Sequence, residues 1–395
     1  MYRWNGTSWA EEAKLTASDG MSGDSFGLSV AIHSNTLLVG APTRDKPGTG
    51  ATDHGSVYVF TRSDTMWSEQ QILTASDADA NDRFGMSAAI LGGRLVVGAS
   101  FENENGSFAG ASYVFELENG TWVEDQKLLA SDGDEGDVFG TSVALSSTTI
   151  AVGAHSHNIG SEDDQGAVYL FTHDGSQWNE LQKLISPDAD PSDQFGFSLS
   201  IFNATLLIGA PTDNEGGDDA GAAYVFTRSG GNWGFAQKLI ASDSGEEDRF
   251  GVDVALHVSY ALVGAPFDDD TANATGSSYF FTRSIGVWSE TEKLTDDDAA
   301  LTDQLGESVA LYFDNAVVGA RADDEAFSDQ GSAQIFANVL NPCPTDLNDD
   351  GMTDGADLGL LLGNWGNSGG SDLNSDGTTD GADLGLLLGA WGACP

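Results

Sequence analysis

The apolar residues of this chain are grouped in short segments rather than in long periodic stretches. Up to about residue 336, segments rich in Val, Leu, Ile, Tyr and Phe alternate with turns rich in Gly, Asn, Asp and Ser. This alternation predicts β-strands joined by tight turns. Helical spacing of apolar residues first occurs after residue 350. The pattern therefore predicts an all-β domain over most of the chain.

The strand pattern is repeated six times. The first five copies each have a Phe-Gly pair, a Gly-Ala pair, a third-strand segment of the form Gly-x-x-Tyr-x-Phe, and a segment that begins with Trp and ends in Lys-Leu or Ile-Leu. The sixth copy is incomplete and has no tryptophan segment. The Phe-Gly pairs are Phe26-Gly27, Phe84-Gly85, Phe139-Gly140, Phe195-Gly196 and Phe250-Gly251, with Leu305-Gly306 as a degenerate sixth. Very short links such as Ser34-Asn35 suit hairpins between the first two strands. Units of four antiparallel strands without helices predict the blades of a β-propeller.

The two ends of this region decide the number of blades. Tyr2 stands seven residues before Trp9, just as Phe115 stands seven before Trp122. The chain therefore begins within a third strand, and near Phe336 the last unit ends with a third strand that has no fourth. One interpretation is that the segment from Trp9 to Leu15 supplies this strand and closes a ring of six blades. The other is that part of a seventh blade lies upstream and that Met1 is not the natural start.

A different pattern follows after residue 345, where one twelve-residue acidic loop occurs twice. Oxygen-bearing side chains occupy positions 1, 3, 5, 9 and 12, and glycine occupies position 6. Such a loop suits calcium, which takes six to eight oxygen ligands. Apolar residues at helical spacing follow each loop: Leu358, Leu361, Leu362 and Trp365, then Leu384, Leu387, Leu388 and Trp391.

These features predict three parts: a propeller over residues 1–336, a linker over 337–345, and a module of two calcium loop-helix units over 346–395. We expect the two apolar stripes to pack against each other. The tail from Pro342 contains nine acidic residues and no Lys or Arg. Without metal its loops should repel themselves open, so binding of two calcium ions and folding are expected to be one event.

Composition narrows the classes of function. The chain has 62 acidic and 15 basic residues, a net charge of -47, which disfavours partners with phosphate backbones or anionic lipid. There is no run of eighteen apolar residues, so no membrane span is expected, and no secretory signal is visible at the start. The two cysteines, Cys343 and Cys394, bracket the tail. They either form a disulfide or remain thiols in a reducing compartment.

Candidate chemistry in the propeller is sparse. Aspartates five residues apart recur in the link between units: Asp19 and Asp24, Asp77 and Asp82, Asp132 and Asp137, Asp188 and Asp193, Asp243 and Asp248, Asp298 and Asp303. They either hold cations or accept backbone N–H groups in turns, and repetition in every unit favours turns. His155 and His157 lack a third ligand at metal spacing. No catalytic motif is found, so no catalytic residue is nominated.

The Phe-Gly and Gly-Ala landmarks make residues 2–336 resemble the FG-GAP repeats of integrin α-subunit propellers and their bacterial relatives. This resemblance implies an extracellular or cell-surface protein whose propeller loops bind a protein or a glycan. Integrin-type repeats often carry an Asp-x-Asn-x-Asp-Gly calcium loop between their first two strands. Here that link is a bare hairpin, so these calcium sites are not carried over.

The tail resembles the dockerin module of cellulosomal enzymes. The resemblance implies these calcium ligands: Asp346, Asn348, Asp350, the Met352 carbonyl, Asp354 and Asp357, then Asp372, Asn374, Asp376, the Thr378 carbonyl, Asp380 and Asp383. Dockerins bind cohesins through loop positions 10 and 11 and through basic helix residues. Here those positions are Gly355-Ala356 and Gly381-Ala382, and the helices have no Lys or Arg. The resemblance therefore supports calcium better than it supports a cohesin-like partner.

Three functions remain open from the sequence. The first is a non-catalytic binding or adhesion protein with a calcium-dependent docking module. The alternative is a component of a polysaccharide-degrading assembly, with the propeller as a carbohydrate-binding or hydrolytic domain. A third is a spacer in a surface layer, which is expected if the chain has no ligand of any class.

Overall fold

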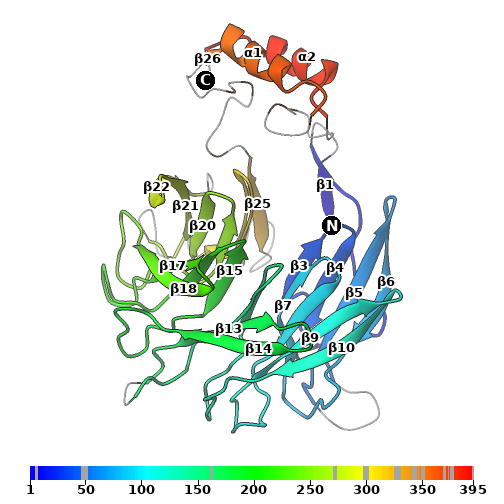
Figure 1. Ribbon diagram of the computed structural model, residues 1–395, viewed down its shortest axis with the longest axis vertical. Helices are drawn as coiled ribbons and strands as arrows, with labels where there is room; N and C mark the ends of the chain where they lie inside the picture. Colours follow the sequence, from blue (N-terminus) through cyan, green and yellow to red (C-terminus); the bar gives the residue numbers. More distant parts are fainter. Residues whose placement is uncertain are drawn as a thin grey trace.

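The chain folds as a six-bladed β-propeller followed by two short helices (Figure 1). The computed structural model describes residues 1–4, 8–45, 52–160, 163–269, 274–296, 302–323, 331–337, 339, 345, 347, 352–367, 371, 373 and 378–393. Blades 1 to 5 are four-stranded antiparallel sheets whose strands pair in chain order, and the sixth sheet has three strands. The predicted all-β propeller is therefore confirmed.

The strands occupy the segments that the repeat predicts. Blade 1 contains β3 (Val30–His33), β4 (Thr36–Ala41), β5 (Ser56–Ser63) and β6 (Met66–Leu73), and blade 2 contains β7 (Phe84–Leu91), β8 (Arg94–Ala99), β9 (Ala111–Glu118) and β10 (Thr121–Leu128). Blade 3 contains β11 (Ser142–Leu145), β12 (Ile150–Ala154), β13 (Ala167–His173) and β14 (Trp178–Leu184), and blade 4 contains β15 (Ser198–Phe202), β16 (Thr205–Ala210), β17 (Ala222–Ser229) and β18 (Asn232–Leu239). Blade 5 contains β19 (Val254–His257), β20 (Tyr260–Ala265), β21 (Ser277–Ser284) and β22 (Val287–Leu294), and blade 6 contains β23 (Leu305–Tyr312), β24 (Asn315–Ala320) and β25 (Ser332–Phe336).

The remaining elements lie at the two ends of the chain. They are β1 (Tyr2–Trp4), β2 (Trp9–Glu11), β26 (Met352–Thr353), α1 (Gly355–Gly363), α2 (Gly381–Gly389) and β27 (Gly392–Ala393).

The core lies between neighbouring blades. The first strand of each blade contacts the first strand of the next, so these strands are innermost and the fourth strands form the outer rim (Figure 1). One cluster joins Leu38 and Val57 of blade 1 to Val97 and Tyr113 of blade 2. In blades 1 to 5 the second and third strands are covered on both faces, so they are continuous apolar runs rather than alternating ones.

The Phe-Gly and Gly-Ala landmarks are two halves of one contact between blades. Phe84 forms a parallel backbone bridge with Gly55 of blade 1, while its buried ring packs edge-on against Tyr113 of its own blade, 5.5 Å between centroids. A Cβ on Gly40 would lie 2.2 Å from the carbonyl oxygen of Gly85. Only glycine permits so close an approach. The corresponding glycines meet at the next four junctions: Gly98 and Gly140, Gly153 and Gly196, Gly209 and Gly251, Gly264 and Gly306.

A polar hook joins neighbouring blades at the outer rim. Ser76, just after β6, donates to Glu124 of β10 from its backbone N–H (2.8 Å) and from its hydroxyl (2.7 Å). The same pair joins blades 2 and 3 as Ser131 with Glu180, and blades 4 and 5 as Ser242 with Glu290. Ser18 and Glu69 form it between the N-terminal segment and blade 1. Between blades 3 and 4, Pro187 and Phe235 occupy these positions. The Phe235 ring instead packs against Phe226, 5.9 Å between centroids.

The first two strands form a hairpin of their own. Tyr2 pairs with Glu11 and Trp4 with Trp9, in the register that Phe60 and Glu69 have in blade 1. They therefore correspond to the ends of a third and fourth strand. The interpretation that Trp9–Leu15 completes the last blade differs from the structure, because β2 pairs with β1 and β25 pairs with β24 alone among the described strands.

The glycine contact predicts a difference between two matched substitutions. Gly110 and Gly120 have nearly the same φ, +85° and +86°, but a Cβ on Gly110 would lie 2.1 Å from the Phe139 carbonyl oxygen, whereas a Cβ on Gly120 has nothing within 4 Å. Gly120→Ala should cost about 1 kcal/mol through left-handed strain. Gly110→Ala adds a backbone clash at a blade junction and should cost roughly 3 kcal/mol or more. Urea unfolding measures both, and equal losses would contradict the junction's role.

Candidate functional sites

The two helices of the tail begin in the same way. Asp354 precedes α1, and its carboxylate accepts the backbone N–H of Ala356 (2.7 Å), while the carboxylate of Asp357 accepts the N–H of Asp354 (2.7 Å). Asp380 and Asp383 repeat this capping box at α2. Carboxylates are stabilised there by the unpaired N–H groups of the first helical turn. Loop positions 9 and 12 therefore converge at each helix start.

The two loops are tied to each other's helices. Asp357 is fully buried, and its other oxygen accepts the N–H of Leu347 (2.6 Å) near the start of the loop. Thr353, at loop position 8, pairs with Gly392 after α2. Thr379, at the same position of the second loop, exchanges backbone hydrogen bonds with Gly366 and Asn367 after α1. The two loop-helix units are therefore interlocked.

Six of the expected calcium ligands lie within the described residues: Met352, Asp354, Asp357, Thr378, Asp380 and Asp383. Asp346, Asn348, Asp350, Asp372, Asn374 and Asp376 lie outside them, as do Cys343 and Cys394. The described donors fit a hard cation, because two carboxylates converge at each helix start and the tail has no basic side chain.

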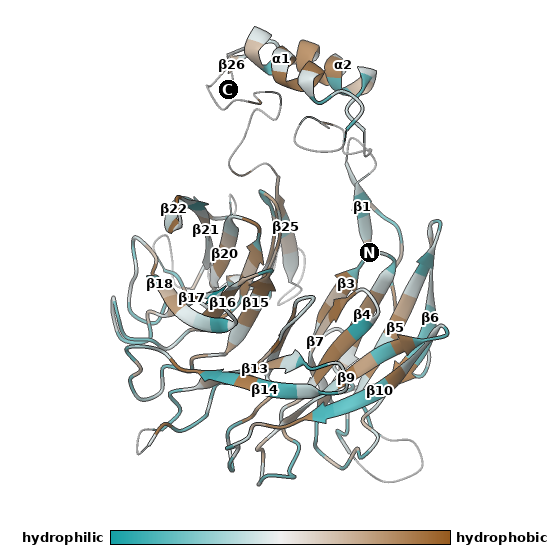
Figure 2. Ribbon diagram, in the orientation of Figure 1, coloured by the Kyte–Doolittle hydropathy of each residue, from teal (hydrophilic) through white to brown (hydrophobic). Residues whose placement is uncertain are grey.

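The apolar stripes pack only in part. Leu361 and Leu387 are fully buried, but Leu362 and Trp365 are 51% and 47% exposed, and their counterparts Leu388 and Trp391 are similar. Figure 2 shows how much of both helices is hydrophobic. The expectation that the whole stripe packs is thus wrong for its outer half. A nine-residue helix with one helical neighbour buries one row of side chains. None of the helices described is long and apolar enough to cross a membrane.

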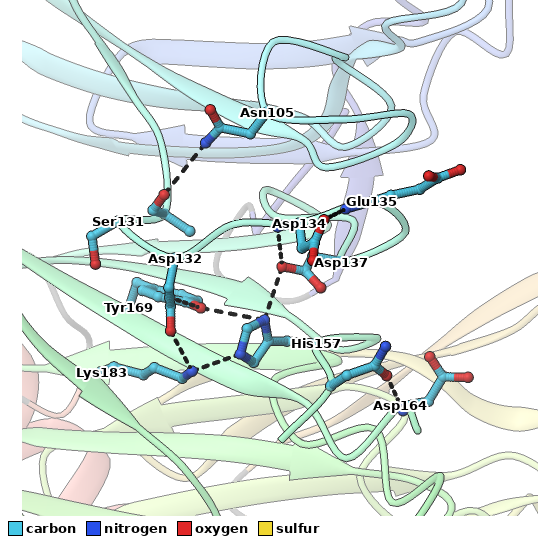
Figure 3. Close-up of polar contacts among 12 residues, drawn as sticks. Asn105, Ser131, Asp132, Asp134, Glu135, Asp137, His157, Asp164, Tyr169 and Lys183 are labelled. Carbon is cyan, nitrogen blue, oxygen red and sulfur yellow. Dashed lines mark hydrogen bonds and ion pairs between the residues drawn. The ribbon is translucent and has the colours of Figure 1, made fainter. Parts of the chain in front are cut away.

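The second aspartate of each linker pair closes a turn. Asp137 accepts the N–H of Asp134 at 2.8 Å (Figure 3). The same bond, to the residue three positions earlier, is made by Asp24, Asp82, Asp193 and Asp248 at 2.6 to 2.7 Å. The turn interpretation therefore holds for these five residues. Asp298 lies outside the described residues.

The first aspartate of the five described pairs joins a network that sequence reasoning missed. In blade 3, Asp132 accepts hydrogen bonds from the Tyr169 hydroxyl (2.8 Å) and from Lys183 Nζ (2.9 Å) (Figure 3). His157 lies between Lys183 (2.6 Å) and Asp137 (2.8 Å). Its ring is therefore held by neighbours within the blade, as a structural role requires.

The other histidine of the pair is also structural. His155 is half-buried and its ring packs against Phe197, 5.2 Å between centroids. Burial lowers the pKa of His155 to about 4, so the imidazole is neutral at physiological pH.

Blades 1, 2, 4 and 5 repeat the network. The aspartates are Asp19, Asp77, Asp188 and Asp243, and the tyrosines are Tyr58, Tyr113, Tyr224 and Tyr279. In blade 2, burial opposes the charge on Lys127, but its hydrogen bonds to Asp77 and two glutamates raise its pKa. The ammonium therefore stays charged. The pairing of β9 with β10 places Tyr113 opposite Lys127. The network could have been predicted from the sequence only if this pairing had been known.

The arrangement of the sites defines a propeller whose recurrent acidic groups anchor each linker to the blade that follows it. The chain matches the family model described as FG-GAP repeat six times, at residues 9–60, 67–115, 122–171, 178–226, 233–281 and 288–336. It therefore belongs to the FG-GAP repeat family. Each match begins at the fourth-strand tryptophan and ends at the third-strand phenylalanine, so one repeat spans two blades.

A curated relative supports the same relationship. The chain is 30% identical to integrin alpha-2 of Mus musculus over 143 residues, which is 31% of this chain and 12% of the mouse protein. The similarity thus concerns a small part of the mouse protein's length.

Asp193 predicts a pH dependence of stability. Burial, reinforced by the nearby charges of Asp213 and Asp190, raises the pKa of Asp193 to about 7. The pKa of this carboxyl is higher in the folded chain than in the unfolded chain. Its contribution to the free energy of unfolding therefore falls as pH rises from about 4 to about 7 and is constant above pH 7. Asp193→Asn should therefore become more stable relative to the wild type as pH rises through this range. The difference in free energy of unfolding should reach on the order of 2 kcal/mol at pH 8 after allowance for solvent screening. Urea unfolding at several pH values measures this, and parallel curves would contradict it.

Proposed function

We propose that this chain is a non-catalytic binding or adhesion protein that acts outside the cell or at its surface. The observation that supports this most directly is the use of the recurrent acidic residues. In blades 1 to 5 the linker aspartates are engaged with tyrosine, lysine, arginine or backbone N–H groups. The residues that could have formed a repeated catalytic or metal site therefore hold the linkers against the blades, and the exposed loops remain for recognition.

The ligand of the propeller is proposed to be a protein that carries positive charge where it meets the loops. The net charge of -47 creates a field that speeds encounter with basic surfaces and opposes acidic ones. The loops between second and third strands concentrate exposed acids such as Asp164, Glu215 and Asp218.

The tail is proposed to be a calcium-dependent docking module of the dockerin type. Its ligands are the two sets named from the sequence, and Asp357 and Asp383 are the buried members of each set. Calcium supplies the positive charge that holds each acidic loop closed. The exposed faces of α1 and α2, with Leu362, Trp365 and their counterparts, then form an apolar surface for a partner. A Cys343–Cys394 disulfide is proposed to clamp the ends of the module.

Calcium titration of the full chain tests the docking module. Isothermal calorimetry should detect two ions per chain. The double variant Asp357→Ala, Asp383→Ala should bind neither, because each loop loses its position-12 carboxylate. Asp64→Ala with Asp125→Ala removes the same charge from exposed positions of the propeller and is the matched control. Unchanged binding by the first variant would refute the ligand assignment.

A binding panel tests the function of the propeller. Immobilised full chain should retain one or more extracellular proteins with basic surfaces, with affinity that falls as salt rises. A parallel panel of glycans and glycoside hydrolase substrates should show no turnover. Turnover that is lost on changing loop carboxylates would instead establish the alternative of a polysaccharide-degrading component.

A further inference from the structure

Three carboxylates in blade 2 have the geometry of a cation site. Oxygens of Asp77, Glu102 and Glu104 lie within 4.8 Å of one another. A charged side chain already lies among them, because Lys127 Nζ is 2.7 Å from Asp77, 3.1 Å from Glu102 and 2.8 Å from Glu104. The same ammonium lies 5.6 Å from the centre of the Tyr113 ring, where a cation is also favoured.

Three more blades place a lysine at the same point. Lys183, Lys238 and Lys293 each stand five residues after the fourth-strand tryptophan, and each binds its linker aspartate at 2.7 to 3.0 Å. Lys238 also binds Asp213 (2.9 Å) and Lys293 also binds Asp268 (2.8 Å). These two acids stand four residues after the glycine of Gly-Ala, as Glu102 does.

In blade 1 the positive charge comes from the position that carries an acid in blades 2, 4 and 5. Ile72 stands where the lysine is expected, opposite Tyr58 in the strand register. Arg44 stands where Glu102, Asp213 and Asp268 stand in their blades. Its guanidinium binds Asp19 and lies 5.9 Å from the centre of the Tyr58 ring. The cation thus comes from the loop after β4 instead of from the fourth strand, and it reaches the same aspartate and tyrosine.

We propose that blades 1 to 5 each contain a cation site that the chain fills with its own lysine or arginine, so that these sites need no divalent metal. What the blade requires is one positive charge between the linker aspartate and the tyrosine ring, whichever segment supplies it. Calcium then acts on the tail alone, and its removal releases the docking module while the propeller stays folded. This last consequence rests on the proposed calcium module.

The exchange in blade 1 provides a charge-swap test on the full chain. Arg44→Glu leaves two acids without a cation, and Ile72→Lys adds a second cation, so each single variant should lower the urea midpoint of the propeller by about 0.5 M. The double variant recreates the arrangement of blade 4 and should recover most of that loss. A double variant that is no more stable than the worse single variant would overturn the proposal.

Removal of the ammonium in blade 2 gives a second readout. Lys127→Met leaves the three carboxylates uncompensated, and 5 mM CaCl₂, roughly a saturating concentration for a weak site, should raise its urea midpoint. Lys14→Met is the matched control, since Lys14 also stands five residues after a tryptophan but is exposed and forms no ion pair among the described residues. Its midpoint should not respond. A variant of Lys127 that folds and ignores calcium would count against a cation site.

The wild-type propeller must itself be indifferent to metal. This is measured in the chain that carries Asp357→Ala and Asp383→Ala, so that the tail contributes no calcium response. EDTA should leave its unfolding midpoint unchanged. A lowered midpoint would overturn the proposal for the propeller, but it would not affect the number of calcium ions measured for the tail. Conversely, if the full chain does not bind two calcium ions, the proposed tail module fails and the charge-swap result is unaffected.

Discussion

A close approach of two backbones, one glycine against another, sets the spacing of neighbouring blades at the five junctions from blade 1 to blade 6. Where Gly40 meets Gly85, neither residue carries the Cβ that would hold the two blades apart. The short distance lets Phe84 bridge to Gly55 and bury its ring in its own blade. Burial of this kind is the main favourable term in folding. The hooks of the rim and the linker networks reach their partners only at this separation.

The repeat made the blades predictable, because strand period, turn chemistry and the order of landmarks agreed in all six units. It did not reveal the network of Asp132, Tyr169 and Lys183. These residues are separated by 37 and 14 positions, and only strand pairing and the path of the linker bring them together. The aspartates were recognised because they recur at short spacing. Their partners were hidden among residues that a strand would contain for packing alone.

The tail shows the same division between local and non-local information. Helix starts follow from neighbouring residues, so the capping boxes at Asp354 and Asp380 agree with the loop pattern. The packing of the stripe depends on how many neighbours a helix has, which period alone does not give. Leu361 is fully buried, while Leu362, the next residue, is half exposed. An apolar period therefore marks a surface able to be buried, whether by the same chain or by another molecule.

The junction between blades 3 and 4 has fewer hydrogen bonds at its rim than its neighbours. Between blades 1 and 2, 2 and 3, and 4 and 5, a serine and a glutamate form two rim hydrogen bonds, but here Pro187 and Phe235 replace them together. The Phe235 ring lies against Phe226 of its own blade, so it does not bridge the two blades. The Gln182 amide still crosses this rim and exchanges two hydrogen bonds with the backbone of Trp233, at 2.9 and 3.0 Å. Under a force that pulls neighbouring blades apart, this rim therefore offers the least hydrogen bonding of these four junctions.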